Sequence, residues 1–336
     1  MSHAVPSVLI VGPAWVGDMV MAQSLFRLLK QGFPDIAIDV VAPAWSQPLL
    51  SRMAEVRDAI EMPLGHGQFR PWRRYGMGKA LRAHQYDWAI VLPYTWKAAL
   101  LPFAAKIPRR TGYVGEARWG LLNDLRRLDK KKLPMMVQRY AALAMDGVIP
   151  TPQEIPKPQL DYTEQGVAAT LCKLGLARPS GSLLVLCPGA EYGPAKCWPA
   201  EHFAQLAQIK IAEGYRVWIL GSEKDRSIGE QIIGQLADHC VNLTGKTTLE
   251  EAIDLMSLAD VVVTNDSGLM HIAAALNRRV IAIYGSSDTT YTPPLTDTAQ
   301  LISLRLDCSP CFKRTCPYGH YDCLNKLTVD RVLDAF

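Results

Sequence analysis

Short apolar runs alternate with longer amphipathic stretches along the whole chain. In the first half, SVLIV at 7–11, IDVVA at 38–42 and WAIVL at 88–92 are predicted strands, and helix-like segments separate them. Continuous apolar runs of this length are typical of strands that are covered on both faces, as in parallel sheets. The alternation therefore predicts an α/β fold in which helices connect parallel strands.

The same pattern restarts after a proline-rich stretch, IPTPQEIPKPQL at 149–160. Proline cannot continue a helix or a central strand, so this stretch is the best candidate for a linker. The strands expected beyond it are LLVLC at 183–187, YRVWIL at 215–220, ADVVVT at 259–264 and, as the last strand, VIAIYG at 280–285. We therefore predict two Rossmann-like domains with parallel sheets facing a central cleft, residues 1–157 and residues 158–336.

Helices are expected between these strands. They span 19–30, 96–105, 200–212, 228–236, 249–258 and 271–276, with a final helix over 329–336. The final helix follows the last expected strand, and we expect that it can pack back across the first domain.

Composition agrees with a globular protein, since 49% of the residues are hydrophobic and 20% are charged. A length of 336 residues suits two domains of ordinary size. No apolar stretch approaches the roughly 18 residues needed to span a bilayer. The start, MSHAVPSVLIV, lacks the positive beginning and the long apolar region of a signal peptide. We therefore expect a cytoplasmic protein.

Positive charge is concentrated in the segment 70–132. It holds 15 Lys and Arg residues against 4 Asp and Glu residues, a net of +11, so the rest of the chain sums to −7. Such a segment attracts nucleic acid, anionic lipid headgroups or a phosphorylated substrate. The alternative is a solvated basic face. The basic and aromatic residues of the segment 70–132 form no recognisable RNA-binding motif, so we expect no nucleic-acid partner.

The most informative motif is TNDSGLMH at 264–271, because it follows an apolar run and opens an Ala-rich helix. Free backbone N–H groups and partial positive charge at a helix N-terminus suit a phosphate. Ser267 and Gly268 would donate N–H groups, and His271 lies on the same helical face as Gly268. The alternative for His271 is a core histidine. The charge of Asp266 opposes phosphate, so its expected roles are capping the helix, orienting the loop or binding sugar hydroxyls.

A second motif, GPAWVGD at 12–18, follows the first strand. Its final residue, Asp18, could accept a proton from a substrate hydroxyl at the carboxyl end of the sheet. A helix N-cap is an equally good interpretation of Asp18. The motif lacks the G-x-G-x-x-G fingerprint, which argues against a nicotinamide dehydrogenase, and no P-loop motif occurs in the chain.

Two further charged residues follow strands in the second half. Lys196, in CPGAEYGPAKCWP at 187–199, could neutralise the charge that grows on a leaving diphosphate. Glu223, in GSEKDR at 221–226, could accept hydrogen bonds from ribose hydroxyls. An ordinary surface lysine and a charged surface turn are the alternatives.

Half of the eight cysteines lie close together near the end of the chain. The spacing of Cys308, Cys311, Cys316 and Cys323 is compatible with tetrahedral zinc, although a second C-x2-C pair is missing. We therefore consider a structural zinc ion, with reduced and partly buried thiols as the alternative. No catalytic metal role is expected for this cluster.

With these pieces together, the chain resembles the ADP-heptose:lipopolysaccharide heptosyltransferases of glycosyltransferase family 9. The matching segments are GPAWVGDMVMAQSLFRLLK at 12–30, APAWSQPLLSRM at 42–53, MPLGHG at 62–67, RRTGYVGEARWGLLND at 109–124, PGAEYGPAKCWP at 188–199 and TNDSGLMHIAAALNRRVIAIYG at 264–285. The resemblance covers nearly the whole chain. Segments in the first half favour the type II branch over type I.

The resemblance implies a GT-B fold, with the acceptor bound by the first domain and the donor by the second. It implies inverting transfer of L-glycero-D-manno-heptose from ADP-heptose to the first heptose of heptosyl-Kdo2-lipid A, without a catalytic metal or any other required cofactor. Asp18 matches the proposed catalytic base, and Lys196 matches the lysine that binds the diphosphate and assists catalysis. The donor-binding residues that it implies are Lys196, Glu223, Asp266, Ser267, Gly268 and His271.

The basic segment gains a role from this resemblance, because lipid A and its core carry anionic groups in an anionic membrane. The candidate acceptor contacts are Arg70, Arg73, Arg74, Lys97, Arg109, Arg110 and Arg118. We expect a cytoplasmic protein that visits the inner leaflet of the inner membrane peripherally. The alternatives are a type I or later-acting core heptosyltransferase, a nucleotide-sugar epimerase on a similar scaffold, and a non-enzymatic binder of polyanions.

Overall fold

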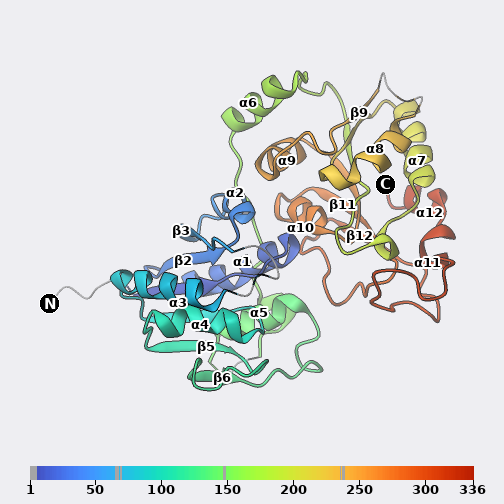
Figure 1. Cartoon of the computed structure of the whole chain (residues 1–336). Helices are drawn as coiled ribbons and strands as arrows, with labels where there is room; N and C mark the ends of the chain where they lie inside the picture. Colours follow the sequence, from blue (N-terminus) through green and yellow to red (C-terminus); the bar gives the residue numbers. More distant parts are fainter. Residues whose placement is uncertain (1–5, 65–67, 69, 147–148, 235, 237–238) are drawn as a thin grey trace. The chain divides into compact units, whose positions relative to one another are not determined.

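The computed structural model describes residues 6–64, 68, 70–146, 149–234, 236 and 239–336 (Figure 1). The chain forms two compact units, Met1–Pro158 (unit 1) and Gln159–Phe336 (unit 2). Among the described residues each unit holds its own six-stranded sheet, and every strand pairing there is parallel. The prediction of an α/β fold with parallel sheets is therefore confirmed. The units divide after residue 158, where the sequence placed the boundary after residue 157.

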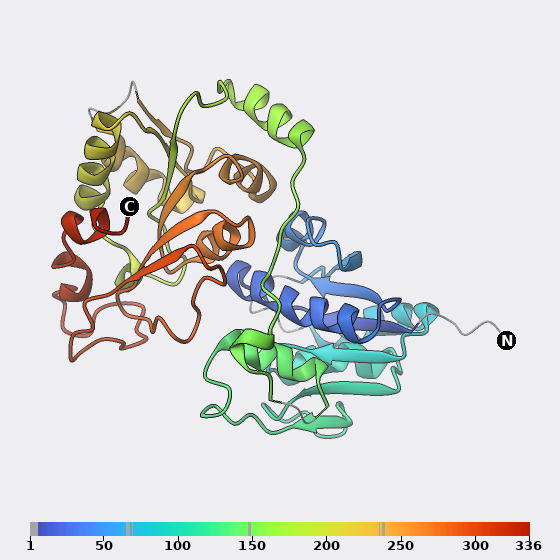
Figure 2. The ribbon, with the colours of Figure 1, turned by 180° about the vertical axis from the view of Figure 1, so that it is seen from behind.

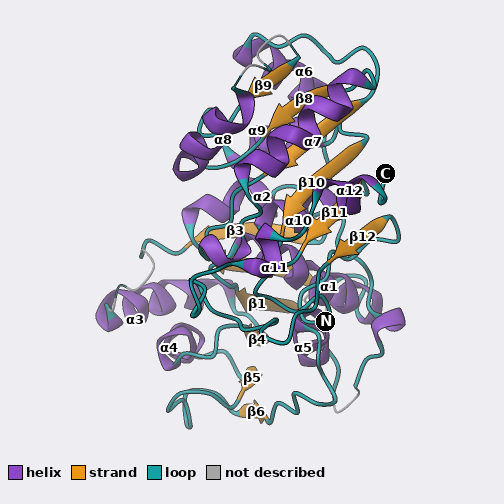
Figure 3. Cartoon of the chain, turned by 90° about the vertical axis from the view of Figure 1, so that its right-hand side faces the viewer, coloured by secondary structure: helices purple, strands orange, loops and turns teal. Residues whose placement is uncertain are grey.

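In unit 1 the strand order is β3-β2-β1-β4-β5-β6. The strands are β1 Ser7–Val11, β2 Ala37–Ala42, β3 Val56–Glu61, β4 Trp88–Val91, β5 Arg109–Tyr113 and β6 Asp124–Arg126. The helices are α1 Val16–Gly32, α2 Gln47–Leu50, α3 Pro71–Ala80, α4 Trp96–Ala104 and α5 Met136–Ala144. Helix α1 packs with α5 and α3 packs with α4, and Figure 3 shows the two pairs on opposite faces of the sheet.

In unit 2 the strand order is β12-β11-β10-β7-β8-β9. The strands are β7 Leu183–Cys187, β8 Arg216–Ile219, β9 Cys240–Asn242, β10 Val261–Asn265, β11 Arg279–Ile283 and β12 Ala299–Ile302. The helices are α6 Glu164–Leu174, α7 Ala200–Ala212, α8 Arg226–Ile233, α9 Leu249–Met256, α10 Gly268–Ala275, α11 Asp322–Asn325 and α12 Val329–Leu333.

Both units have the same topology. In each, the chain builds one half of the sheet outwards from its first strand and then crosses over to build the other half. The order reverses between β1 and β4 in unit 1 and between β7 and β10 in unit 2. Ligands of open α/β sheets bind outside the carboxyl ends of the strands at such a switch point. The loops after these four strands are therefore where a site is expected.

The sequence analysis missed strands β3, β5, β6, β9 and β12. Edge strand β3 and edge strand β12 lack a fully buried residue, so neither shows the continuous apolar run of a central strand. Strand β12 also follows the strand that was expected to be the last. Both motif helices begin earlier than predicted: α1 starts at Val16 and α10 starts at Gly268.

The C-terminal helix packs within unit 2. Helix α12 packs against α7, and its Val329 and Val332 are buried in the core of unit 2. The Arg279 side chain donates hydrogen bonds to the last two carbonyl oxygens, at 2.9 and 2.5 Å, which fixes the terminus beside β11. Figure 2 shows α12, in red, beside the yellow-green α7. The apolar face of this helix is therefore part of the core of unit 2.

Candidate functional site

An ion pair joins the loops on either side of the switch point in unit 2. Lys196 lies in a short 3-10 helix, Pro194–Lys196, in the loop after β7, and Asp266 directly follows β10. The Lys196 Nζ is 2.5 Å from Asp266 Oδ2, and the Ser287 hydroxyl donates to the same oxygen at 2.5 Å. Because Ser287 follows β11, the Asp266 carboxylate holds together loops from three adjacent strands.

This ion pair is largely buried, since the side chains of Lys196 and Asp266 are only 16% and 4% exposed. Separating two charges in such surroundings is costly, so each needs the other. Asp266 was expected to cap the helix, orient the loop or bind sugar hydroxyls. Its contacts support the second of these roles. Lys196 also balances the charge of Asp266. The carboxylate therefore repels an anion at the N-terminus of α10 less strongly.

Asn265, which the sequence analysis missed, fixes the loop that carries Lys196. Its Oδ1 accepts from the backbone N–H of Trp198 at 3.0 Å, and its Nδ2 donates to the carbonyl oxygen of Pro188 at 2.6 Å. Trp198 is fully buried and donates through Nε1 to the Leu327 carbonyl oxygen at 2.8 Å. Both ends of the loop are therefore tied to the core, which positions the lysine before any ligand arrives.

Helix α10 begins inside the predicted phosphate motif. Ser267 is its N-cap residue, with extended backbone and no side-chain capping bond, and Gly268 is its first residue. The first N–H groups of a helix have no partner within that helix. The motif therefore presents backbone donors at the carboxyl end of β10, as the sequence predicted, and the helix starts three residues earlier than expected.

His271 lies in the first turn of α10 and is only 5% exposed. The pKa of its imidazole is lowered to about 4, chiefly by burial; the Asp266 charge opposes this shift and the Lys196 charge adds to it. The ring is therefore neutral near pH 7. A neutral imidazole can form a hydrogen bond with a phosphate or a sugar but contributes no positive charge.

Glu223 lies in a 3-10 turn, Glu223–Asp225, in the loop after β8, and its carboxylate is exposed. It pairs with Arg226 Nη2 at 2.7 Å. A Cβ atom added at Gly245 would lie 2.2 Å from Glu223 Oε2 and 3.0 Å from Glu223 Cα, so Glu223 packs directly against this glycine. This position is compatible with ribose binding and equally with a surface ion pair.

The switch point of unit 1 carries Asp18 in the first turn of α1. The N-cap of this helix is Trp15, so the interpretation of Asp18 as an N-cap is wrong. Asp18 is partly exposed. Gly12 allows this turn to fold tightly, since a Cβ atom there would approach Met19 Cε to 2.7 Å.

Arg118 has a structural role at the same switch point. Its side chain is buried, and its guanidinium donates to the Pro93 carbonyl oxygen at 2.6 Å and to the Tyr113 carbonyl oxygen. Glu116 Oε2 accepts from the backbone N–H of Trp96 at 3.1 Å. The segment after β5 thus supports the loop after β4. Arg118 is therefore corrected from an acceptor contact to a support of the loop that leads to Lys97.

Three more of the predicted acceptor contacts, Arg74, Arg110 and Arg109, make contacts within unit 1. Arg74 is buried on the inner face of α3, where its Nη1 lies 3.6 Å from Met62 Sδ and burial lowers the pKa of its guanidinium. Arg110 donates to the carbonyl oxygens of Leu121, at 2.7 Å, and Ile107, at 2.6 Å.

Arg109 lies over the Trp88 ring, 4.3 Å from its centroid, and pairs with Asp124 at 3.1 Å and with Asp146. The charge count could not separate such internally bonded arginines from solvated ones. Of the predicted set, Arg70 and Arg73 are exposed and Lys97 is partly exposed.

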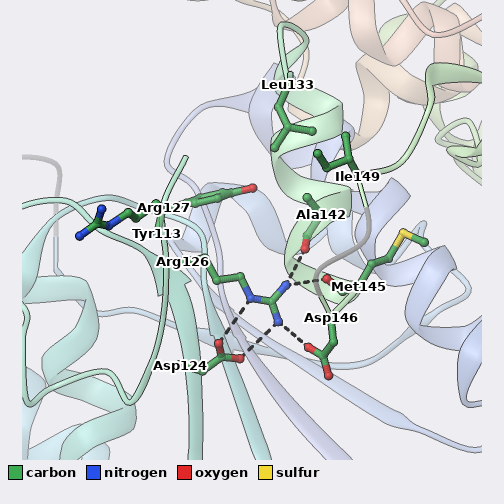
Figure 4. Close-up of a pocket in the computed structure, with 9 residues that line it drawn as sticks. All are labelled: Tyr113, Asp124, Arg126, Arg127, Leu133, Ala142, Met145, Asp146 and Ile149. Atoms are coloured by element: carbon green, nitrogen blue, oxygen red, sulfur yellow. Dashed lines mark hydrogen bonds and ion pairs between the residues drawn. The ribbon is translucent and has the colours of Figure 1, made fainter. Parts of the chain in front are cut away.

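A pocket of about 450 Å³ lies beside β6 and α5 in unit 1 (Figure 4). Arg126 crosses its base and donates to the carbonyl oxygens of Ala142, at 2.6 Å, and Met145, at 2.8 Å, at the C-terminal end of α5. The carboxylates of Asp124 and Asp146 occupy its other nitrogens. The guanidinium therefore serves as a helix cap, and the pocket offers no unused charge at its base.

The zinc expectation is not supported. All four clustered cysteines are described, and no group of three or more His, Cys, Asp or Glu side chains among the described residues is arranged to hold a metal ion. Backbone N–H groups, that of Tyr321 first, lower the pKa of the Cys316 thiol, whereas burial raises that of Cys323 to about 11. Free thiols, the alternative interpretation, describe these residues in the structure. Over the described part of the chain, no helix has the length and apolar character to cross a membrane.

Comparisons with known proteins agree with this geometry. The family model of glycosyltransferase family 9 (heptosyltransferase) matches residues 74–322. The chain is 47% identical to lipopolysaccharide heptosyltransferase 2 of Escherichia coli K12, over 97% of this chain and 96% of that protein. It is 54% identical to lipooligosaccharide heptosyltransferase 2 of Haemophilus influenzae, over 89% and 88% of the two chains.

A solved structure gives the same result at the level of the fold. The structure of E. coli ADP-heptose LPS heptosyltransferase II matches with a TM-score of 0.86 and 45% identity, covering 98% of this chain and 97% of that one. This match confirms the expected GT-B architecture, and the family match covers both units. The chain therefore belongs to glycosyltransferase family 9, the heptosyltransferases.

Proposed function

We propose that this enzyme transfers L-glycero-D-manno-heptose from ADP-heptose to the first heptose of heptosyl-Kdo2-lipid A, with inversion at the anomeric carbon. The observation that carries the proposal is the 47% and 54% identity, over 97% and 89% of this chain, to two enzymes named heptosyltransferase 2. The diphosphate site that we propose consists of Lys196, paired to Asp266, beside the N-terminus of α10.

Unit 2 binds the donor in this proposal. The backbone N–H groups of Ser267 and Gly268 contact the diphosphate, and Lys196 supplies the positive charge. His271 donates a neutral hydrogen bond to a phosphate or sugar oxygen, and Glu223 accepts from the ribose hydroxyls. The support for these roles is the arrangement of the loops after β7, β8 and β10 along one edge of the sheet.

Unit 1 provides the base. The Asp18 carboxylate takes the proton from the acceptor hydroxyl as its oxygen forms the new bond to the anomeric carbon. The bond from this carbon to the diphosphate oxygen breaks on the opposite face, and ADP carries away the electron pair. Charge grows on ADP as the oxocarbenium-like centre forms, and Lys196 with the dipole of α10 stabilises it. These groups can perform the task for which other transferases use a divalent cation.

Arg70, Arg73 and Lys97 remain the proposed acceptor contacts, because they keep exposed or partly exposed cationic groups. The acceptor is a lipid of the inner leaflet. We therefore place the working enzyme at the cytoplasmic surface of the inner membrane, bound peripherally.

An acceptor panel tests the function. Purified enzyme is incubated with ADP-heptose and either heptosyl-Kdo2-lipid A or Kdo2-lipid A without heptose, with and without EDTA. We expect transfer only to the heptosylated acceptor and the same rate with EDTA. Transfer to the acceptor without heptose would assign a type I activity, and loss of turnover with EDTA would refute metal independence. Conversion of ADP-heptose in the absence of any acceptor would instead indicate an epimerase.

A further inference from the structure

Helix α3 presents an exposed tryptophan among cations on its outward face. Trp72 is 84% exposed, against 68% for Trp119 and 69% for Tyr318. Removing so large a ring from water would stabilise any complex that covers it by about 2 kcal/mol or more. The fold of unit 1 leaves this ring uncovered.

The inner face of α3 explains why Trp72 faces outwards. A Cβ atom added at Gly78 would lie 2.5 Å from the carbonyl oxygen of Leu101 and 2.7 Å from the Cβ of Ala104, so α3 is seated directly on α4. Arg74 is buried on the same side. With 3.6 residues per turn, Trp72 and Lys79 then lie together on the opposite face.

The charged residues of α3 all have the same sign. Arg73 and Lys79 are exposed on α3, Arg70 is exposed immediately before it, and the sequence PWRRYGMGKA of Pro71–Ala80 contains no carboxylate. The Lys79 ammonium lies 5.3 Å from the centroid of the Tyr75 ring, which keeps the positive charge beside the aromatic surface. An aromatic ring with basic residues around it is the composition of a helix that lies in a membrane interface.

We propose that α3 is the membrane-docking element of this enzyme and that Trp72, Arg73 and Lys79 rest on an anionic lipid surface. The indole ring occupies the headgroup layer, and the cations contact lipid phosphates. The argument for this occupant is charge complementarity, because α3 carries only positive charge and an anionic leaflet attracts about 1 kcal/mol per basic residue. The inference rests on the proposed function, which places the acceptor in a membrane.

Vesicle co-sedimentation tests the docking surface. The intact protein is mixed with vesicles of phosphatidylethanolamine and phosphatidylglycerol, or with neutral phosphatidylcholine vesicles. We expect clear preference for the anionic vesicles, and a loss of affinity of roughly tenfold or more for Trp72→Ala and for Lys79→Glu. Tyr318→Ala and Arg331→Glu, which change an exposed aromatic ring and an exposed charge in unit 2, are the matched controls and should bind within about twofold of the parent.

Either of two results would overturn the proposal: equal binding of the parent to both kinds of vesicle, or binding of Trp72→Ala and Lys79→Glu that equals the controls. ADP binding by calorimetry checks that each variant is folded. Turnover separates this inference from the proposed function. With a deacylated, water-soluble acceptor Trp72→Ala should keep the parent rate, and with vesicle-embedded acceptor it should be slower. If the enzyme transfers heptose but its binding to vesicles does not depend on α3, only the docking proposal is refuted. If the enzyme binds vesicles through α3 but transfers no heptose, only the proposed function is refuted.

Discussion

The two units share a strand order but hold their switch-point loops in different ways. In unit 2 the Lys196–Asp266–Ser287 cluster joins the loops after β7, β10 and β11 through side chains, and the Asn265 side chain bonds to backbone groups of the loop after β7. In unit 1 Arg118 donates to the carbonyl oxygens of Pro93, in the loop after β4, and of Tyr113, and Asp18 is partly exposed. The same topology therefore supports a fixed, charge-balanced site in one unit and a more accessible carboxylate in the other.

This difference suits the two halves of the proposed reaction. A diphosphate changes charge during transfer, and a rigid site of fixed dipoles stabilises that change with little reorganisation. An acceptor hydroxyl needs a base that solvent and substrate can reach. The following predictions test whether the two switch points are as different in function as they are in structure.

The largest effect is expected at Asp18. Asp18→Asn keeps the shape of the side chain but removes its basicity, so kcat should fall by roughly 10²- to 10⁴-fold while ADP-heptose affinity is unchanged. Steady-state kinetics and calorimetry with ADP measure the two quantities. Asp35→Asn, at an exposed aspartate of unit 1, is the control and should behave as the parent. A near-normal rate for Asp18→Asn would show that Asp18 is not the catalytic base.

Lys196→Ala should weaken both binding and turnover, in contrast to Asp18→Asn. We expect a loss of about 10²- to 10³-fold in kcat/KM, because one charged donor to the leaving group is lost. Asp266 would remain buried without its partner, which should lower the free energy of unfolding by about 3 kcal/mol. Kinetics and urea unfolding test both effects.

The control for Lys196→Ala is Lys224→Ala, since Lys224 is 74% exposed in its pair with Glu191. We expect that variant to lose less than about 1 kcal/mol of stability and no activity. If Lys196→Ala and Lys224→Ala lost the same amounts of stability and activity, the Lys196–Asp266 pair would be an ordinary surface ion pair.

His271 should make the stability of the enzyme dependent on pH. Its folded-state pKa of about 4 is below the unfolded value near 6.5, so the unfolded chain binds more protons between these values. The free energy of unfolding should therefore rise from pH 4 to pH 6.5, by about 3 kcal/mol in total, and this contribution is fully present above pH 6.5. Urea unfolding across this range measures it.

His271→Gln should flatten this slope, whereas His239→Gln, at an exposed histidine of unit 2, should leave it in place. An unchanged slope in His271→Gln would contradict a buried, neutral imidazole beside Lys196.

The smallest effect is expected at Arg118. Arg118→Ala leaves the carbonyl groups of Pro93 and Tyr113 without their donors and should lower the free energy of unfolding by about 2 kcal/mol. Arg118→Lys should recover only part of the loss, because one ammonium cannot reach both carbonyl oxygens as well as a guanidinium does. Arg127→Ala, at an exposed arginine of unit 1, is the control. If the first variant lost only acceptor affinity and no stability, Arg118 would be a substrate contact after all.

Some elements were predictable because their signal is local. The strands at 7–11 and 183–187 are buried on both faces, so their apolar runs are continuous, and the motif TNDSG indicated a helix after β10, although that helix begins three residues earlier than predicted. The exposed strands β3 and β12 lack that signal, because half-covered or edge positions accept polar residues.

The roles of the charged residues were decided by the tertiary structure. From the sequence, Arg73 and Arg118 are two equal members of a basic segment, yet one is exposed on α3 and the other is buried against backbone carbonyls. Asp266 and Lys196 are 70 residues apart, and only the pairing of β7 with β10 brings their charges together. Hydrophobic pattern is a property of neighbours in the chain, whereas the state of a charge depends on partners that only folding supplies.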